Sequence, residues 1–272
     1  DGGHKQWVDA VCNQIKNNLG LSAMRVIMPM PGNEAMAQAL ARRLDGEPGI
    51  LDWRRFPDGE AYVRIVSDVR GKRVDFVCTL ANPDPQVLTL IFAAAAARER
   101  GAESVHLIAP YLAYMRQDKS FAPGEAVSAV HFARLLSQAF DTLVTIDPHL
   151  HRIGGLDEIF SIPARAGAAA PLIGAWIARN VDASLIVGPD RESEQWVKEV
   201  ARCAGAPYVV ANKRRIGDEH VRVDLPDMTP WRDRRPVLVD DIVSSGRTMA
   251  EAARLLMQRG MVKPHCVAIH AV

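Results

Sequence analysis

Features typical of several other protein classes are scarce or absent in this sequence. Its 272 residues include only four cysteines, Cys12, Cys78, Cys203 and Cys266, and none of them belongs to a CxxC pair. Scattered cysteines, mostly within apolar runs, predict buried free thiols in a reducing compartment rather than a disulfide framework. No run of about 18 apolar residues is present, and the first residues lack the pattern of a signal peptide. We therefore expect a cytoplasmic protein.

An excess of charge of either sign is also absent. Lys and Arg total 33 and Asp and Glu total 32, so the formal net charge is only +1. Because nucleic-acid coats and polybasic membrane surfaces need a positive excess, we expect neither kind of partner. An anionic ligand must instead be held by local groups. The apolar fraction of 48% is sufficient for hydrophobic cores, and the length is comfortable for two domains.

Short runs rich in Val, Ile and Leu alternate with longer Ala-rich amphipathic segments, which is the pattern of parallel strands joined by helices. The expected strands are residues 24–28, 74–79, 105–109, 141–147, 184–187, 207–211, 236–239 and 265–271. The expected helices are residues 33–44, 85–99, 126–139, 172–180, 193–204 and 248–259, with an additional one at 7–18. Small residues at 161–168 predict a linker. The sequence therefore predicts an α/β protein with an N-terminal extension (1–23) and two domains (24–163 and 164–272), each a mostly parallel sheet flanked by helices.

The strongest local signal is the segment VLVDDIVSSGRT at residues 237–248, which runs into an amphipathic helix. A buried strand should deliver Asp240 and Asp241 to the carboxyl edge of a sheet, where α/β proteins bind ligands. Two carboxylates can accept hydrogen bonds from vicinal ribose hydroxyls, and the turn and helix N-terminus can hold a phosphate. The alternative is an ordinary strand-turn-helix junction with capping hydroxyl residues. Adjacent acids at the end of a buried strand repel each other and fit that alternative poorly.

This segment resembles the phosphoribosyl-diphosphate binding loop of proteins with the phosphoribosyltransferase fold. Four further segments resemble the ribose-phosphate diphosphokinases, or phosphoribosyl diphosphate synthetases: FPDGEAYVR at 56–64, PYLAYMRQDK at 110–119, DPHLH at 147–151 and KRRIGD at 213–218. The resemblance extends from residue 24 to the end of the sequence and keeps the order of the family. It implies two tandem phosphoribosyltransferase-like domains. It also implies an enzyme that transfers the pyrophosphoryl group of ATP to the anomeric hydroxyl of ribose 5-phosphate, giving phosphoribosyl diphosphate and AMP.

The same resemblance assigns residues to the ribose 5-phosphate site in the second domain. These residues are Asp190, Asp240, Asp241, Ser244, Ser245, Gly246, Arg247 and Thr248.

Two segments are candidates for ATP binding in the first domain. Phe56 offers an aromatic face for adenine, and the acids beside it can accept the adenine amine, although a hairpin turn with a core Phe would explain the same residues. Arg116 suits bidentate contact with triphosphate oxygens, and a solvated loop is the alternative. The resemblance implies contacts from the Phe56 segment across a subunit boundary, and a homo-oligomer that is a dimer or a dimer-based hexamer. It assigns to the ATP site Phe56, Asp58, Glu60, Arg116, Gln117 and, as a residue that orients its neighbours, Asp118.

A metal ion is expected together with the nucleotide. His149 and His151 form a His-x-His pair, but phosphoryl transfer usually uses Mg²⁺, which prefers oxygen ligands, so a zinc site is not expected. A histidine at a strand end is often only structural. The resemblance assigns His149 to the complex of Mg²⁺ with the nucleotide, assigns Asp190 to a second Mg²⁺ ion and the ribose, and leaves His151 without a role. After Asp190 the family usually carries small residues, whereas here residues 191–193 are Arg-Glu-Ser, which puts close approach of the backbone to the substrate in doubt or adds a cation there.

A basic cluster opens the most polar part of the chain. Lys213, Arg214 and Arg215 on a mobile loop could close over ATP and neutralise charge on the transferred group, whereas a solvated charge run is the simpler interpretation. The resemblance implies that Lys213 and Arg215, together with His149, are catalytic, and that Arg214 matters less.

Two other functions stay open from the residues alone. A nucleobase phosphoribosyltransferase would share the loop at 240–248 but would not need the Phe56 and Arg116 segments. A non-catalytic homologue that regulates an active synthetase would accommodate the unusual residues 191–193. The presence of Lys213, Arg215 and His149 argues against that regulatory homologue.

Overall fold

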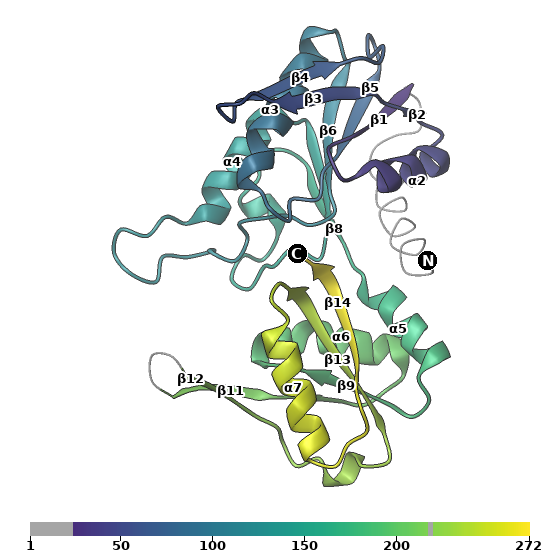
Figure 1. The fold of residues 1–272 in the computed structure, drawn as a ribbon, viewed down its shortest axis with the longest axis vertical. Helices are drawn as coiled ribbons and strands as arrows, with labels where there is room; N and C mark the ends of the chain where they lie inside the picture. Colours follow the sequence, from purple (N-terminus) through teal and green to yellow (C-terminus); the bar gives the residue numbers. More distant parts are fainter. Residues whose placement is uncertain (1–23, 217–219) are drawn as a thin grey trace. The chain divides into compact units, whose positions relative to one another are not determined.

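A computed structural model describes residues 24–216 and 220–272 of the chain (Figure 1). It divides into two compact units, with the boundary between Gly167 and Ala168. The division therefore falls four residues beyond the boundary expected from the sequence. The helix expected at residues 7–18 and Cys12 lie outside the described residues.

Unit 1 is built on a six-stranded parallel sheet with the strand order β2-β1-β5-β6-β7-β8. Its strands are β1 (Arg25–Pro29), β2 (Glu47–Pro48), β5 (Arg73–Val77), β6 (Ser104–Ala109), β7 (Thr142–Ile146) and β8 (Ala164–Gly167). Its helices are α2 (Glu34–Leu44), α3 (Asp84–Glu99), α4 (Ser128–Ala139) and the short 3₁₀ helix η1 (Leu156–Glu158).

The order of the strands explains where these helices lie. The connections β5-α3-β6 and β6-α4-β7 step across the sheet in one direction, and β1-α2-β2 steps in the other. Because parallel crossovers are right-handed, α3 and α4 cover one face of the sheet and α2 covers the opposite face, as Figure 1 shows. The loops that leave the carboxyl ends of β6 and β7 therefore emerge side by side.

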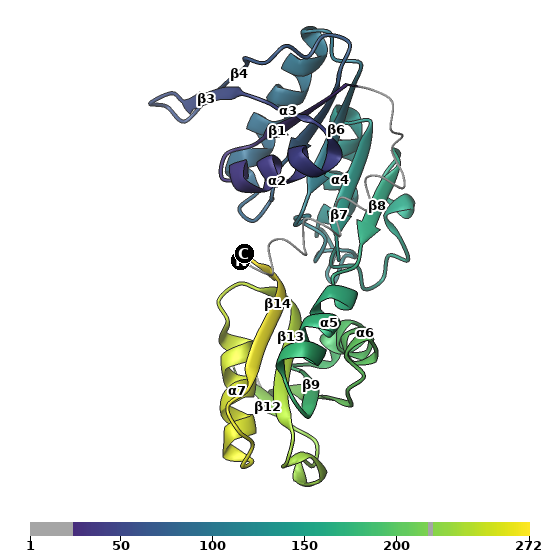
Figure 2. The same ribbon diagram turned by 90° about the vertical axis from the view of Figure 1, so that its right-hand side faces the viewer.

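An antiparallel hairpin extends from the side of unit 1 (Figure 2). It consists of β3 (Leu51–Arg55) and β4 (Ala61–Ile65), and β4 packs against α3. At the turn, the backbone N–H of Phe56 donates to the carbonyl of Glu60 at 2.8 Å. Gly59 has a φ of +93°, a left-handed conformation that favours glycine.

The amino ends of the strands in unit 1, at the edge of the sheet opposite the loops after β6 and β7, contain a buried polar cluster. Asp75 is fully buried, with Arg25 Nε 3.1 Å and Arg73 Nη2 2.7 Å from its carboxylate oxygens. On β6, the His106 ring nitrogens lie 2.7 Å from Thr142 Oγ1 and 2.8 Å from Ser104 Oγ. Burial and the charge of Arg73 lower the pKa of His106 to about 4, so this ring is neutral at physiological pH.

Unit 2 has a four-stranded parallel sheet with the order β10-β9-β13-β14. Helices α6 and α7 lie on opposite faces, because β9-α6-β10 and β13-α7-β14 step in opposite directions. A separate antiparallel pair, β11 and β12, follows β10 directly. The elements are α5 (Ala170–Asn180), β9 (Ser184–Gly188), η2 (Arg191–Ser193), α6 (Glu194–Ala204), β10 (Tyr208–Val210), β11 (Asn212–Ile216), β12 (His220–Asp224), η3 (Thr229–Trp231), β13 (Arg235–Val243), α7 (Arg247–Gln258) and β14 (His265–Ala271).

Each strand and helix expected between residue 24 and the end is present, and most bounds agree within two residues. Four features differ from what the sequence predicted. Residues 164–167 form β8 rather than a linker, because they pair with β7. Asp240 and Asp241 lie within β13, which continues to Val243. Strands β3, β4, β11 and β12 were not expected. Cys266, on the edge strand β14, is exposed rather than buried.

No described helix is both long enough and apolar enough to cross a membrane.

Candidate functional site

The sugar-side candidates gather at the carboxyl edge of the sheet in unit 2. Strands β9 and β13 are parallel neighbours, with Val187 paired to Leu238, so the residues that follow on each strand approach the same edge. Asp190 lies two residues beyond β9, and Asp240 and Asp241 lie near the end of β13. The sheet thus brings Asp190 together with Asp240 and Asp241, which lie about fifty residues later in the sequence.

Two of these carboxylates affect the ionisation of the third. Burial raises the pKa of Asp240 to about 7, and the negative charges of Asp241 and Asp190 add to the shift. Asp241 is only 5% exposed, and its Oδ1 accepts a hydrogen bond from the backbone N–H of Ile242 at 2.8 Å. A ligand hydroxyl that donates to a partly buried carboxylate with like charges beside it stabilises the ionised form of that carboxylate.

The turn after β13 is suited to an anion. Residues 244–246 connect the strand to α7, and Gly246 adopts a left-handed φ of +70° at the N-cap position. No side chain caps this helix, so the first backbone N–H groups of α7 are not satisfied by a side chain of the cap residue. Ser244, Ser245 and Arg247 are exposed, and Thr248 is partly buried. Hydroxyls and helix-terminal amides together suit a phosphate group.

The turn after β9 is tightly packed despite its large residues. The Asp190 carboxylate accepts from the backbone N–H of Glu192 at 3.0 Å and of Ser193 at 3.2 Å, and Ser193 Oγ donates to the Asp190 carbonyl at 2.6 Å. A side chain on Gly188 would come within 2.6 Å of Ser193 Oγ. The backbone at Gly188 and the side chain of the buried Ser193 are therefore the groups that approach each other closely at this turn.

The sequence suggested that Arg191 could add a cation near the substrate, but in the structure its side chain contacts another residue of unit 2. Its Nε donates to Asn212 Oδ1 at 2.9 Å, and Asn212 is the first residue of β11. Lys213 pairs with Val223, and Arg215 with Val221, in the backbone ladder of β11 and β12. Arg191 therefore links the β9 turn to the base of the hairpin that carries the two predicted catalytic cations. Sequence reasoning missed this link, although the departure from small residues marked the position.

On the nucleotide side, the predicted adenine contacts occupy the β3–β4 turn. Phe56 is 41% exposed rather than part of the core, and its ring packs edge-on to Tyr62 with centroids 6.3 Å apart. Arg54 lies over both rings. Asp58 and Glu60 are exposed, and the Asp58 carboxylate accepts from the Glu60 backbone N–H at 3.1 Å. The turn thus presents an aromatic surface with two acids beside it.

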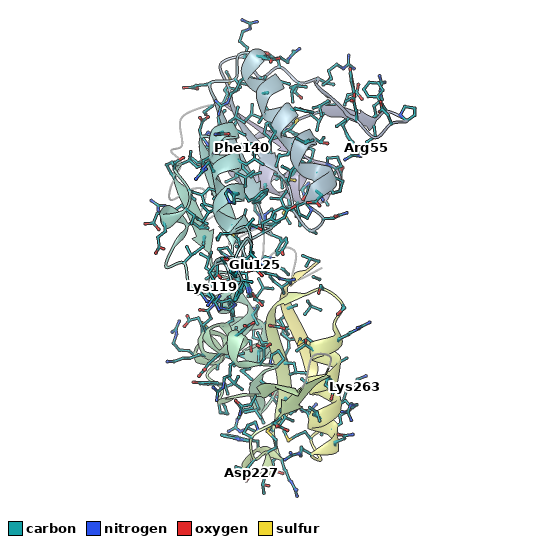
Figure 3. The ribbon with its side chains drawn as sticks, turned by 90° about the vertical axis from the view of Figure 1, so that its left-hand side faces the viewer. Arg55, Lys119, Glu125, Phe140, Asp227 and Lys263 are labelled. Atoms are coloured by element: carbon teal, nitrogen blue, oxygen red, sulfur yellow. The ribbon has the colours of Figure 1, made fainter. Side chains whose placement is uncertain are left out.

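The loop after β6 carries the next group of predicted residues. Arg116 is exposed and Gln117 is partly buried, and Figure 3 labels Lys119 and Glu125 farther along the same loop. Asp118 differs from its neighbours because its side chain is only 1% exposed and is engaged by Arg152 at 2.8 Å. Burial opposes ionisation of Asp118, but the hydrogen bonds from Arg152 outweigh it and lower the pKa.

The loop after β7 carries the predicted metal-binding histidine. Asp147 begins it with a φ of +36°, an uncommon conformation for a residue with a side chain. The rings of His149 and His151 meet edge to face, with centroids 4.1 Å apart. His151, to which the sequence assigned no role, is therefore the packing partner of His149.

Hydrogen bonds and an ion pair connect these three segments within unit 1. Arg55 of the hairpin, labelled in Figure 3, donates to the Pro85 carbonyl, and the hydroxyl of Tyr114 donates to Asp84. Tyr114 precedes Arg116, and the Asp118–Arg152 pair joins that loop to the one with His149. Unit 1 thus links all three predicted nucleotide segments, which are up to about ninety residues apart.

Among the described residues, no group of three or more His, Cys, Asp and Glu side chains is arranged to hold a metal ion. Mg²⁺ usually retains several waters and takes oxygen ligands from substrate phosphates. An ion that binds together with a nucleotide therefore needs few ligands from the protein.

The chain matches known proteins over both units. Residues 25–139 match the N-terminal domain of ribose phosphate pyrophosphokinase, and residues 155–272 match the phosphoribosyl transferase domain. A ribose-phosphate pyrophosphokinase from Methanopyrus kandleri is 37% identical over 87% of this chain and 81% of its own length. One from Methanosarcina acetivorans is 33% identical over 89% of this chain and 83% of its own length.

A solved structure shows the same fold. The phosphoribosylpyrophosphate synthetase from Mycobacterium smegmatis superposes with a TM-score of 0.77 and 24% identity, covering 91% of this chain and 81% of that one. The predicted α/β fold with two phosphoribosyltransferase-like domains is confirmed. The predicted enzyme class is confirmed as well, and the chain belongs to the ribose-phosphate pyrophosphokinase family.

Proposed function

We propose that unit 1 binds ATP and unit 2 binds ribose 5-phosphate, and that the residues predicted from the sequence carry out the transfer between them. The anomeric oxygen of the sugar attacks the β-phosphorus of ATP, the bond from that phosphorus to the α-β bridging oxygen breaks, and AMP leaves. The attacking hydroxyl loses its proton. The observation that carries this proposal is the linkage of the three nucleotide segments within unit 1, because a phosphoribosyltransferase would not need the Phe56 and Arg116 segments.

Ribose 5-phosphate is assigned to the carboxyl edge of β9 and β13. Asp240 and Asp241 accept hydrogen bonds from the ribose hydroxyls, and Asp190 supports them from the neighbouring turn. The 5-phosphate lies on the turn at residues 244–248 and the N-terminus of α7. The raised pKa of Asp240 supports this role, since a hydroxyl donor stabilises the ionised carboxylate.

ATP is assigned to the linked segments of unit 1. The exposed ring of Phe56 stacks on adenine, and the neighbouring acids, Asp58 and Glu60, accept its amine. Arg116 and Gln117 contact the triphosphate. Because Asp118 is almost fully buried and paired with Arg152, we assign it to orientation of that loop.

Mg²⁺ is the proposed cofactor. His149 of unit 1 is assigned to the complex of the ion with the nucleotide, and Asp190 of unit 2 is assigned to a second ion beside the ribose. When bound, the ion neutralises the phosphate oxygens and orients the triphosphate. Lys213 and Arg215, on the β11–β12 hairpin, are the proposed catalytic residues that balance the negative charge on the transferred pyrophosphoryl group.

A homo-oligomer is proposed as the working form. Leu88 and Phe92 on α3 are 60% and 48% exposed, and Leu135 on α4 is 39% exposed. Between these helices lies an open pocket of about 560 Å³, lined mainly by apolar atoms. Contiguous exposed apolar surface of this kind supports a protein–protein contact. A Leu88→Glu, Phe92→Glu variant should sediment as a smaller species than the wild type, whereas Met257→Glu in unit 2 should not.

The reaction itself is tested by phosphorus NMR of the purified protein with ATP, Mg²⁺ and ribose 5-phosphate. Appearance of AMP and a sugar-linked diphosphate, without ADP, is the expected result. ATP that stays intact across metals and phosphate concentrations would refute the catalytic assignment. Free pyrophosphate formed from phosphoribosyl diphosphate and a nucleobase would instead indicate a phosphoribosyltransferase.

A further inference from the structure

The loops after β6 and β7 are joined by an ion pair whose cation was not singled out by the sequence. Arg152 Nη1 lies 2.8 Å from Asp118 Oδ1, and the backbone N–H of Arg152 donates to Asp118 Oδ2 at 3.1 Å. Both carboxylate oxygens of Asp118 are therefore held by one residue, 34 positions later in the chain. The Asp118 side chain is 1% exposed and that of Arg152 is 45% exposed.

Arg152 also contacts the β6 loop at a second point. Its guanidinium carbon lies 5.4 Å from the ring centre of Phe121, and Lys119 Nζ lies 4.9 Å from the same ring. These distances are within the range of cation–π contacts. Because the Arg152 guanidinium contacts both Asp118 and Phe121, it restricts the orientation of the β6 loop as well as its distance from the β7 loop.

The β6 loop is in turn folded upon itself around Glu125. The Glu125 carboxylate accepts from the backbone N–H of Phe121 at 2.6 Å and of Ala122 at 3.1 Å, and from Gln117 Nε2 at 3.3 Å. Residues 117–125 thus form one connected piece. A restraint applied by Arg152 at Asp118 and Phe121 is therefore passed to Gln117.

We propose that Arg152 is a positioning residue for nucleotide binding, which acts through Asp118 to fix Arg116 and Gln117 relative to His149. This inference rests on the proposed function for the roles of those three residues. Loops lack the ladder of hydrogen bonds that fixes helices and strands, so site residues on loops need supporting contacts to hold their geometry. A buried carboxylate strongly disfavours arrangements that separate it from its cation, which makes this pair an effective support.

A direct contact between Arg152 and the triphosphate would be the competing role, because its side chain is partly exposed. The two roles differ in their dependence on Asp118. If Arg152 acts through Asp118, removal of the guanidinium has no further effect once Asp118 is gone. If Arg152 touches the nucleotide, its effect persists without Asp118.

The test measures the Kd for Mg²⁺-ATP by calorimetry, alongside steady-state turnover, in Arg152→Ala, Arg152→Lys, Asp118→Ala and the Asp118→Ala, Arg152→Ala double variant. The matched control is Arg98→Ala, whose residue is similarly exposed at 40% and pairs with Asp141 at 3.0 Å at the other edge of the same sheet. Thermal unfolding of each variant separates loss of fold from loss of positioning.

We expect Arg152→Ala to weaken ATP binding roughly tenfold, since small displacements of positioning groups have large effects. Ribose 5-phosphate affinity should stay within about twofold, Arg152→Lys should recover part of the loss, and Arg98→Ala should resemble the wild type. In the Asp118→Ala background the Arg152→Ala change should add less than about twofold.

ATP affinity of Arg152→Ala equal to that of Arg98→Ala would overturn the inference, and so would a full tenfold loss in the Asp118→Ala background. Wild-type protein that binds ATP but gives no AMP would overturn the proposed function. The binding ratios would still decide the role of Arg152 in that case.

Discussion

Asp118 in unit 1 and Asp240 in unit 2 occupy comparable places, near the carboxyl edge of a parallel sheet, yet their pKa values shift in opposite directions. Hydrogen bonds from Arg152 overcome burial and lower the pKa of Asp118. Burial and two neighbouring carboxylates raise the pKa of Asp240 to about 7. The nucleotide side has its negative charge balanced by the protein itself. The sugar side keeps negative charge that the ligand can balance.

This difference separates two ways of preparing a site. A neutralised ion pair fixes the shape of a loop before the ligand binds. A cluster of like charges stores unfavourable energy that hydroxyl donors or cations relieve on binding. The following predictions test whether the two units really differ in this way.

The largest effect is expected from the cations of the β11–β12 hairpin. If the sugar side depends on cations that act during the reaction, Lys213→Ala and Arg215→Ala should each lower kcat by about 10³-fold, as loss of charge-stabilising groups does in phosphoryl transfer. The Kd for ribose 5-phosphate should change less than about twofold. Arg214→Ala is the control. Near-normal turnover in both variants would contradict the assignment of this hairpin.

The second prediction concerns stability and the charge on Asp240. Its pKa rises from the usual 3.8 to about 7 on folding, so the folded protein binds more protons than the unfolded chain between these values. Wild-type stability should therefore fall as the pH rises from about 4 to 7. Asp240→Asn removes this effect and should raise the free energy of unfolding by about 1–2 kcal/mol at pH 8.

Denaturant unfolding at several pH values measures that difference. Below about pH 4 the Asp240→Asn variant and the wild type should converge, because Asp240 is then protonated in both states. Asp182→Asn, an exposed substitution of the same kind in unit 2, serves as the control. A variant that is less stable than the wild type at pH 8 would show that the charge on Asp240 is already balanced.

The third prediction concerns Asp118, whose substitution should lower the free energy of unfolding, and by less than the Asp240 substitution raises it. The pKa of Asp118 is lowered on folding, so its ionised form stabilises the protein above the usual carboxyl pKa, and this stabilisation is lost as the pH falls through the lowered value. Asp118→Asn should cost about 1 kcal/mol at pH 7, the typical net contribution of an intramolecular hydrogen bond. The cost should shrink in acid. The same unfolding series detects it, and a cost that grows in acid would rule out the Arg152 pairing.

The smallest effect is expected from Arg191. It is exposed and donates a hydrogen bond to Asn212 at the base of the hairpin. A single exposed contact contributes less than about 1 kcal/mol, so Arg191→Ala should lower kcat only about threefold. The neighbouring Glu192→Ala substitution keeps the backbone donor to Asp190 and should have no effect on kcat. Equal rates for both variants would mean that the link does not position the hairpin.

The sequence predicts the periodic parts of this fold well, for a physical reason. Strands buried on both faces are continuous apolar runs, and their helices have amphipathic stripes, so both leave a local pattern. The β3–β4 hairpin leaves no such pattern because its residues are mostly exposed or only partly buried, and the β11–β12 hairpin leaves none because its sequence is largely polar. Asp240 and Asp241 look like the end of a strand, since polar residues usually end buried runs, yet backbone pairing with β14 continues to Val243.

The candidate residues could be predicted from local motifs, but their partners could not. Asp118 and Arg152 are 34 residues apart, and nothing near either position indicates that they pair. The same holds for Arg191 and Asn212, which meet only because β10 lies beside β9. Such contacts depend on strand order, which a single sequence does not encode in any short segment.

The buried polar cluster at the amino edge of unit 1 has a consequence for assembly of the sheet during folding. Strands β1, β5 and β6 are apolar on both faces, so sliding one of them along its neighbour by a residue would still bury hydrophobic side chains. Such a slip would turn Asp75 to the opposite face of the sheet, away from Arg25, and leave a buried charge without that cation. The cluster thus penalises misaligned sheets, and the aligned sheet places the loops after β6 and β7 at the same level.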